Sequence, residues 1–399
     1  MATVTSKTPS PVAEIKPEKL PITRPSFDAS EVAMVEQCLQ SGWVTQGPLT
    51  VRFEQLFAQR HAVKHALATT SCTAALHLAT SALELGAGDE VIVPAFTWVT
   101  SAHAAEYVGA KAVFADVDLK TFNFDIHALA AAITPRTRAI VVVHLFGLAA
   151  PMDEIMALAR RHKLRVIEDA ACAVGTTYKG QPIGGIGDYG CFSFHPRKVI
   201  TTGEGGMVTT NDPELNYKIS CLRNHGAMGH RGQPAAPAKP YSMGQFEVLG
   251  YNLRLSDIQA AVGVAQMAKL DDLLAERKRL ALGYLDLLHD CGDLALPRAS
   301  EPSGHTYQSF VVRLLEGGNP RRNRVMDHLD AQGIQTRPGT HAVHRLGYYA
   351  KKYDLQAEQF PNACTAEDTT ITLPIFPGMS EAQQERVVAE LLIGLGQSR

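Results

Sequence analysis

Residues 166–210 read VIEDAACAVGTTYKGQPIGGIGDYGCFSFHPRKVITTGEGGMVTT, and the rest of the chain is arranged around this segment. It begins with a short apolar strand that ends at Asp169, and it contains Lys198 shortly before the glycine-rich turn at 201–206. Glycines at this density indicate close backbone packing more than a solvated loop. Because ligands of α/β proteins bind at the carboxyl ends of parallel strands, we expect the sheet to bring Asp169 and Lys198 into one site.

Outward from this stretch, apolar strands alternate with helical segments. Strands are expected at 66–69, 90–94, 112–115, 139–144 and 165–168, each followed by ten or more residues of helical pattern. This alternation predicts an α/β fold with a mostly parallel sheet and helices on both faces. Two more strands, 190–194 and 206–210, follow without a helix between them, so a hairpin-like pair is expected to make the sheet mixed.

Three regions are expected along the chain. Residues 1–20 are rich in Pro, Ser, Thr and Lys and predict a flexible tail. Residues 21–255 are expected to form a large domain that contains the sheet, with helices at 27–42 and 49–60 before it. Residues 256–399 are expected to hold a long bridging helix from Ser256 toward His289, followed by a small C-terminal domain. That domain has a predicted strand at 308–314 and predicted helices at 322–332 and 380–395.

The composition excludes several classes of protein. The 399 residues are 45% hydrophobic and 20% charged, and a net charge of -2 does not suggest a nucleic-acid partner. No apolar run approaches the ~20 residues of a membrane span, and the N-terminus has no apolar signal core. The seven cysteines are scattered without a CxxC pair, which indicates neither a disulfide framework nor a metal site. We therefore expect a reduced, cytoplasmic setting.

One motif imitates a dinucleotide site. Residues 185–190 read GIGDYG and match GxGxxG, but that fingerprint must follow a strand and open a helix. Here a turn precedes the motif and a predicted strand follows it. We interpret the motif as a structural turn.

Small hydroxyl residues mark a possible phosphate site. Ser71, Cys72 and Thr73 come directly after a predicted strand and open a helix. Such residues can simply cap the helix, or the free amides and the positive helix end can bind a phosphate. Taken alone the capping interpretation is favoured, whereas a nearby Lys198 and Asp169 favour phosphate binding. Trp98, also after a strand, can pack in the core or stack on a flat ring.

Lys198 and Asp169 suggest one cofactor chemistry. Most lysines are surface residues, and a carboxylate at a strand end can instead cap the next helix. Together, however, an amine and a carboxylate at a sheet edge are what pyridoxal phosphate (PLP) requires. The amine binds the cofactor aldehyde as a Schiff base, and the carboxylate keeps the pyridine nitrogen protonated.

The chain resembles the DegT/StrS family of PLP-dependent sugar aminotransferases. The motifs that support the resemblance are SGWVTQGP (41–48), SCTAAL (71–76), PAFTWVTSA (94–102), VIEDAACAVG (166–175), FSFHPRK (192–198), TTGEGGMVTTND (201–212), LRNHG (222–226) and LGYNLRLSDIQAAVG (249–263). The resemblance extends from about residue 20 to the C-terminus. It implies a type I, aspartate aminotransferase-like fold, with a large PLP-binding domain and a smaller C-terminal α/β domain.

The resemblance also implies a role for particular residues. Lys198 is the Schiff-base lysine and Asp169 the partner of the pyridine nitrogen. The remaining implied cofactor contacts are Ser71, Cys72, Thr73 and Ser193 at the phosphate, Trp98 stacked on the ring, Cys172 near the ring oxygen, and Asn252 at the phosphate of the partner subunit's cofactor. The last contact implies a homodimer with shared active sites.

Three departures from the family pattern are visible, and one of them is Cys72 of the SCT turn, where Gly is frequent. The family commonly has Gln or His three residues after the aspartate, where this chain has Cys172. A thiol is a weak hydrogen-bond partner, so the contact to the ring oxygen is expected to differ. Many members also carry an aromatic residue and a proline between two C-terminal histidines, where this chain reads His341-Ala-Val-His344. Either histidine can touch substrate, or both can be structural.

The expected activity is transamination. Related dehydratases replace the lysine with histidine, so Lys198 favours an aminotransferase. The resemblance implies L-glutamate as donor and a keto-sugar, most often nucleotide-linked, as acceptor in amino-sugar biosynthesis. A free cyclitol ketone is an alternative acceptor, and a non-catalytic PLP-binding regulatory protein is an alternative function. Sugar-nucleotide contacts are expected in the Gly/Pro-rich segment 226–250 and in the loop 340–344.

Overall fold

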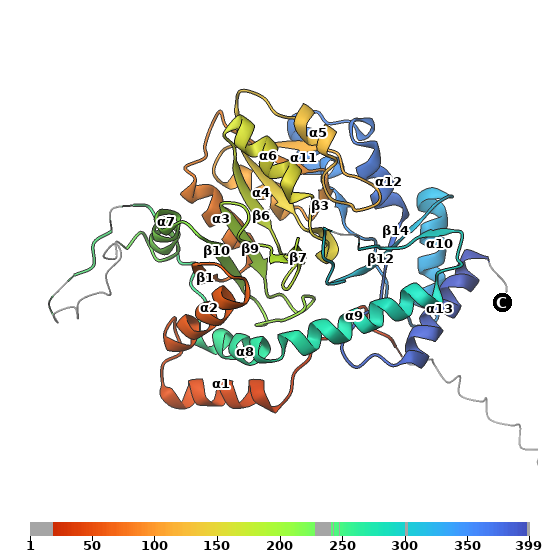
Figure 1. The fold of residues 1–399 in the computed structure, drawn as a ribbon, viewed down its shortest axis with the longest axis horizontal. Coiled ribbons are helices and arrows are strands. Elements are labelled where there is room, and N and C mark those ends of the chain that lie inside the picture. Colours follow the sequence, from red (N-terminus) through yellow and green to blue (C-terminus); the bar gives the residue numbers. More distant parts are fainter. Residues whose placement is uncertain (1–18, 228–240, 242, 247, 300–301, 397–399) are drawn as a thin grey trace, which may run out of the picture.

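The computed structural model describes residues 19–227, 241, 243–246, 248–299 and 302–396. At its centre is a seven-stranded sheet of order β1-β10-β9-β6-β5-β2-β4 (Figure 1). Its strands are β1 (His65–Thr69), β2 (Glu90–Pro94), β4 (Lys111–Ala115), β5 (Thr137–Val143), β6 (Arg165–Asp169), β9 (Tyr189–Ser193) and β10 (Gly206–Thr210). Strands β4, β2, β5, β6 and β9 pair in parallel, whereas β10 is antiparallel to both β9 and β1. The predicted mixed, mostly parallel sheet is confirmed.

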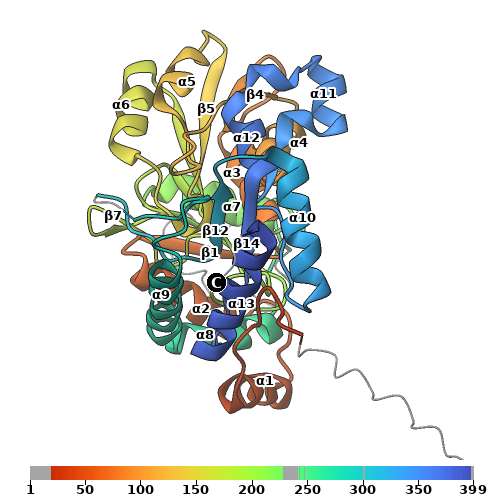
Figure 2. The ribbon, with the colours of Figure 1, turned by 90° about the vertical axis from the view of Figure 1, so that its right-hand side faces the viewer.

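Helices cover both faces of this sheet (Figure 2). One face packs on α3 (Cys72–Ala82), α4 (Thr100–Tyr107) and α7 (Pro213–Arg223), and the other on α2 (Pro48–Arg60), α5 (Ile126–Ala131), α6 (Met152–His162) and α8 (Asp257–Ala268). Side chains of a strand alternate between the two faces, so Val141 joins the first core while Ile140 and Val142 join the second. Burial on both sides explains why β5 reads as a continuous apolar run.

The bridging segment consists of two helices, where the sequence predicted a single one. Helix α8 ends at Ala268 and α9 (Leu270–Leu287) follows after Lys269 (Figure 1). Lys269 has φ -112° and ψ 13°, outside the helical region, and its Nζ pairs with Asp28 at 2.9 Å and Glu31 at 2.7 Å. Those acids open α1 (Ala29–Ser41), which packs on α8. The apolar periodicity of the sequence continues through both helices, so it does not reveal the break between them.

The small domain is built on a three-stranded sheet. Its elements are β11 (Leu294–Ala295), β12 (Phe310–Leu314), β14 (Thr370–Leu373), α10 (Gly318–Ala331) and α13 (Glu381–Leu395). Leu20 is buried in the core of this domain and forms a β-bridge with Ile334, so the described part of the chain begins in the small domain. Residues 1–18 of the predicted tail lie outside the described residues.

Part of the C-terminal region returns to the large domain. Strand β13 (His341–Ala342) pairs with β3 (Phe96–Thr97), and α11 (Gly347–Tyr353) and α12 (Pro361–Thr369) bury Tyr349 and Ala363 in the large-domain core. The sequence did not predict β13, α11, α12 or β14, because they are short and lack a long periodic pattern.

The GxGxxG sequence is a turn between β8 (Gln181–Pro182) and β9, as predicted. A Cβ added at Gly187 would lie 2.8 Å from the carbonyl oxygen of Val166. Glycine at this position therefore permits close contact between the turn and β6, and the motif has no helix to present to a dinucleotide.

Asp257 caps a helix that has no cap of its own. Gly47, which precedes α2, has no side chain to offer, and the buried Asp257 carboxylate accepts from the amides of Gly47, Leu49 and Thr50 and from the Thr50 hydroxyl, at 2.6 to 3.0 Å. The contact joins the SGWVTQGP loop to the start of α8 across the sequence.

Replacing Asp257 by alanine should lower the free energy of unfolding by about 3 kcal/mol, because buried donors lose their acceptor. The midpoint of urea unfolding measures this change. Asp272→Ala, an exposed acid on α9, is the control and should change stability by less than about 0.5 kcal/mol. Equal midpoints for the two variants would contradict the assignment of Asp257 as the cap of α2.

Candidate active site

A cavity of about 420 Å³ lies where the carboxyl ends of the parallel strands meet the small domain. The large domain contributes Ser71, Cys72, Thr73, Trp98, Asp169, Cys172, Ser193, His195, Arg197 and Lys198, and the small domain contributes Gln308, Ser309, Arg337, Thr340 and Thr372. The structure therefore brings together nearly all of the predicted cofactor contacts. Asn252, His344 and His341 are not among the lining residues.

Asp169 ends β6 and is 4% exposed. Its Oδ2 accepts from the Ser101 hydroxyl at 2.7 Å, and its Oδ1 accepts from the Ala171 amide at 3.2 Å. Burial raises the pKa of this carboxyl, although these hydrogen bonds and the charge of Lys198 oppose the rise. The anionic form of Asp169 is thus incompletely compensated by the chain, and a cation in the cavity would stabilise that form.

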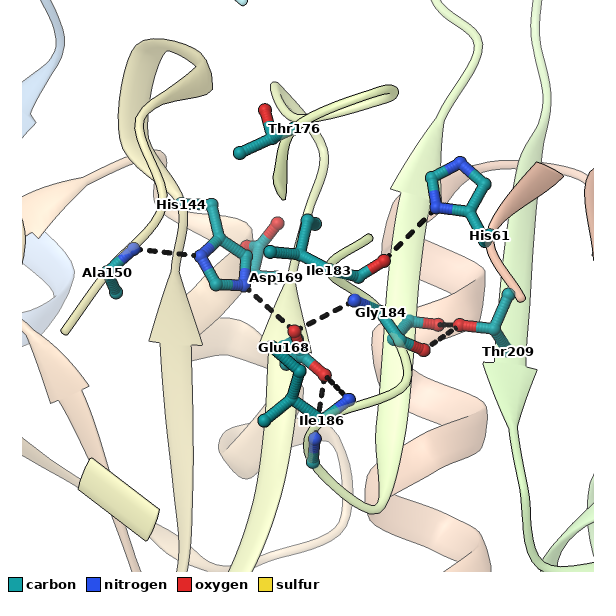
Figure 3. A network of polar contacts seen from close by, with 12 residues as sticks. His61, His144, Ala150, Glu168, Asp169, Thr176, Ile183, Gly184, Ile186 and Thr209 are labelled. Atoms are coloured by element: carbon teal, nitrogen blue, oxygen red, sulfur yellow. Dashed lines mark hydrogen bonds and ion pairs between the residues drawn. The ribbon is translucent and has the colours of Figure 1, made fainter. Parts of the chain in front are cut away.

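The neighbouring Glu168 fixes the end of the same strand (Figure 3). Its buried carboxylate accepts from His144 Nε2 at 3.0 Å and from the amides of Gly184, Ile186 and Gly187 at 2.7 to 2.9 Å. His144 Nδ1 accepts from the Ala150 amide, so Nε2 carries the proton that His144 donates to Glu168. Burial tends to raise the pKa of Glu168, but these hydrogen bonds outweigh burial and lower it.

Lys198 lies on the turn that follows β9. Its amide donates to the carbonyl of His195 at 2.8 Å, and the next residues, Val199 and Ile200, are buried. Its amine contacts the Cys172 sulfur at 3.1 Å. The amine and the Asp169 carboxylate therefore lie in the same cavity, with Cys172 beside the amine.

The part of the cavity lining formed by the start of α3 suits a phosphate. Ser71 caps α3 by accepting from the Ala74 amide at 3.1 Å, so the capping interpretation holds. The start of α3 nevertheless lines the cavity together with Ser193, where helix amides attract an anion. A Cβ on Gly206 would lie 2.4 Å from the carbonyl carbon of Ser71, so glycine is required for β10 to approach this turn.

Trp98 and the two histidines differ in position. Trp98 is 54% exposed at the cavity, so it is available to cover a flat ring. His341 lies beside it, with ring centroids 5.5 Å apart. His344 is fully buried, its Nε2 is 3.4 Å from the Cys364 sulfur, and burial lowers its pKa to about 4. A substrate contact by His344 does not fit this placement, whereas His341 lies at the edge of the site.

Asn252 is exposed and lies outside the cavity of its own chain, pairing in a bridge with Asn224. The prediction that it serves a partner subunit's cofactor remains a prediction. Of the segment 226–250, residues 228–240, 242 and 247 lie outside the described residues, so its predicted sugar-nucleotide contacts are not located.

The residues of this cavity fit PLP. The buried Asp169 is able to pair with a pyridinium, Lys198 is within the same cavity, and the start of α3 is free to accept a phosphate. In the described part of the chain, no group of His, Cys, Asp and Glu residues is arranged to hold a metal ion. No helix of the described residues is long and apolar enough to cross a membrane.

Sequence reasoning missed Ser101 and Arg337. Ser101 belongs to the quoted PAFTWVTSA motif, but only the fold shows that its hydroxyl reaches Asp169. Arg337 comes just before the loop 340–344, and no local signal distinguishes it from a surface arginine.

Comparisons with known proteins agree with this geometry. Residues 25–392 match the DegT/DnrJ/EryC1/StrS aminotransferase family. The chain is 42% identical over 377 residues to GDP-perosamine synthase of Caulobacter vibrioides, covering 94% of this chain and 97% of that protein. DesV of S. venezuelae superposes with a TM-score of 0.85 at 34% identity, over 96% of this chain and 100% of the other.

A proposed sugar aminotransferase of Streptococcus pneumoniae, solved in its PLP-form, superposes with a TM-score of 0.89 at 26% identity, over 95% of this chain and 99% of the other. The predicted type I fold is confirmed by these structures. The match over residues 25–392 includes Asp169, Cys172, Ser193 and Lys198 of the cavity lining. The chain belongs to the DegT/DnrJ/EryC1/StrS aminotransferase family.

Proposed function

We propose that this PLP-dependent aminotransferase moves an amino group from L-glutamate to a nucleotide-linked keto-sugar. The observation that supports this most directly is the cavity in which Lys198 and the buried Asp169 meet at the carboxyl edge of the sheet. The similarity to GDP-perosamine synthase over 94% of the chain supports a nucleotide-linked sugar as the acceptor.

The residues of the site have separate roles in this proposal. PLP supplies an aldehyde for the amino group and a ring that withdraws electrons. The Lys198 amine takes the proton from the donor Cα and releases it within the same half-reaction, and with the acceptor it moves a proton in the opposite direction. Asp169 holds a negative charge at the ring nitrogen, and Ser101 orients that carboxylate. Ser193 and the first residues of α3 bind the phosphate, while Trp98 covers the ring.

A homodimer is part of the proposal. Large apolar side chains are exposed on α1 and on the following loop, including Val32, Leu39 and Trp43, and others are exposed at Met243 and Leu249. Exposed apolar surface of this kind is typical of an interface. Asn252 is close to Leu249 in the sequence and is exposed, so a partner subunit is able to reach it.

The first experiment is an absorbance spectrum of the purified protein with PLP, before and after L-glutamate. Loss of the cofactor band with formation of 2-oxoglutarate establishes the donor half-reaction, and keto-sugar nucleotides are then compared with free cyclitol ketones as acceptors. Lys198→Ala should reduce turnover by about 10⁴-fold or more. Lys278→Ala, an exposed lysine on α9, should not change it. An unchanged spectrum in the wild type would refute the proposed donor.

Asp169→Asn should slow the donor half-reaction by about 10- to 1000-fold, because a nearby opposite charge shifts a pKa by 1–3 units. Ser101→Ala keeps the carboxylate but removes its 2.7 Å hydrogen bond, so a smaller loss, about 10-fold or less, is expected. Rates of cofactor-band loss at saturating glutamate measure both effects. A rate of wild-type size in Asp169→Asn would contradict the role of this carboxylate.

Asn252→Ala should weaken PLP binding if Asn252 serves the partner's site. Mixing Asn252→Ala subunits with Lys198→Ala subunits then creates heterodimers in which one site has both Lys198 and a partner's intact residue at 252. Activity well above the sum of the two separate variants is expected after subunit exchange. Activity equal to that sum, with heterodimers verified by mass spectrometry, would place Asn252 outside the shared site.

A further inference from the structure

Gln308 of the small domain reaches the turn that carries Lys198. Its Nε2 donates to the carbonyl of Arg197 at 2.7 Å, across 111 residues of sequence and from one domain to the other. Within the described residues, this carbonyl accepts no other hydrogen bond. Gln308 is buried, and a hydrogen bond made by a buried amide costs free energy when one partner is removed.

The peptide bond before Lys198 is thereby held at both of its polar groups. Its carbonyl oxygen, which belongs to Arg197, accepts from Gln308. Its amide nitrogen, which belongs to Lys198, donates to the carbonyl of His195 at 2.8 Å. One residue earlier, the amide of Arg197 donates to His195 Nδ1 at 3.2 Å. These contacts fix the direction in which the Lys198 side chain leaves the backbone.

Gln308 is itself held in one orientation. The Ser309 hydroxyl donates to its Oε1 at 3.1 Å, and since the oxygen of an amide accepts while the nitrogen donates, this contact turns Nε2 toward Arg197. Arg277 of α9 donates to the backbone carbonyl of Gln308 at 3.1 Å. A Cβ on Gly147 would lie 3.1 Å from the Gln308 amide nitrogen, so the large domain also packs closely on this backbone.

A lysine amine ends a flexible four-carbon chain, so its position depends on how firmly the backbone at its base is held. A reacting group misplaced by about 1 Å loses about 100-fold in rate. We propose that Gln308 is a positioning residue for Lys198, through which the small domain fixes the turn that carries the amine. The inference rests on the proposed function, because it takes the Lys198 amine as the group that moves the proton.

This role separates rate from affinity. Gln308 lines the cavity, so a direct contact with the donor is the competing interpretation. A positioning residue changes the rate of the donor half-reaction and leaves the affinity for glutamate as it is, whereas a residue that binds the donor changes the affinity.

The test compares PLP-loaded Gln308→Met with Gln384→Met. Gln384 is the matched control, because it is a buried glutamine of the small domain whose Nε2 donates to the backbone carbonyl of Leu280, also at 2.7 Å, and it does not line the cavity. The maximal rate of cofactor-band loss with glutamate should fall about 10- to 100-fold for Gln308→Met. It should stay at the wild-type value for Gln384→Met, and the glutamate concentration at half-maximal rate should be unchanged in both.

A second readout does not require turnover. After PLP is removed, the rate at which the cofactor band returns on adding PLP should fall in Gln308→Met, because the Lys198 amine must reach the aldehyde. This rate should be unchanged in Gln384→Met. Gln308→Asn keeps the amide on a shorter side chain that does not reach Arg197, so it should show the same two losses, and it replaces the methionine variant if that variant does not fold.

The outcomes distinguish this inference from the proposed function. Wild-type rates in both Gln308 variants would overturn the positioning role, and so would a raised half-saturating glutamate concentration at an unchanged maximal rate. A wild type that forms the cofactor band but does not react with glutamate would overturn the proposed donor, and the return of the band would still decide the role of Gln308. A wild type that forms no cofactor band would overturn the role of Lys198, and both proposals with it.

Discussion

The buried carboxylate of Glu168 is the constraint on which the site depends. A carboxylate taken out of water costs several kcal/mol unless hydrogen bonds replace its hydration. Here His144 and three amides of the 184–187 turn supply those bonds (Figure 3). The same contacts join β6, the loop after β5 and the turn before β9, and the first two of these segments carry the cavity residues Asp169 and Leu145. Movement of any one of them would leave a buried charge without partners.

The pKa values of the two adjacent carboxyl groups are consequently shifted in opposite directions. Successive side chains of a strand point to opposite faces, so Glu168 turns toward the amides while Asp169 turns toward the cavity. The hydrogen bonds lower the pKa of Glu168, whereas burial raises that of Asp169. The first carboxylate has all its partners within the chain. The second has a hydroxyl and one amide, and it remains able to pair with a cationic ring.

The small domain is tied to the cavity by another buried charge. Arg277 of α9 is buried and donates to the carbonyls of Gln308 at 3.1 Å and Ile375 at 3.4 Å, both residues of the cavity lining. It anchors the small-domain wall, which also contains Arg337, to the helix that leads from the large domain. The cavity is lined by both domains, and small-molecule sites commonly occur between domains.

The mixed, mostly parallel sheet could be predicted from the sequence, because the apolar runs and the period of the helices between them are local properties. Ordered motifs also gave the family, which the match over residues 25–392 confirmed, and they predicted the pair Lys198 and Asp169. Other features became visible only in the tertiary structure. They are the break at Lys269, the pairing of β13 with the large domain, the burial of His344, the hydrogen bond of Ser101 to Asp169, and the presence of Arg337 in the cavity lining. Each depends on residues distant in the chain, and the packing and charge between such residues leave no pattern in a local window.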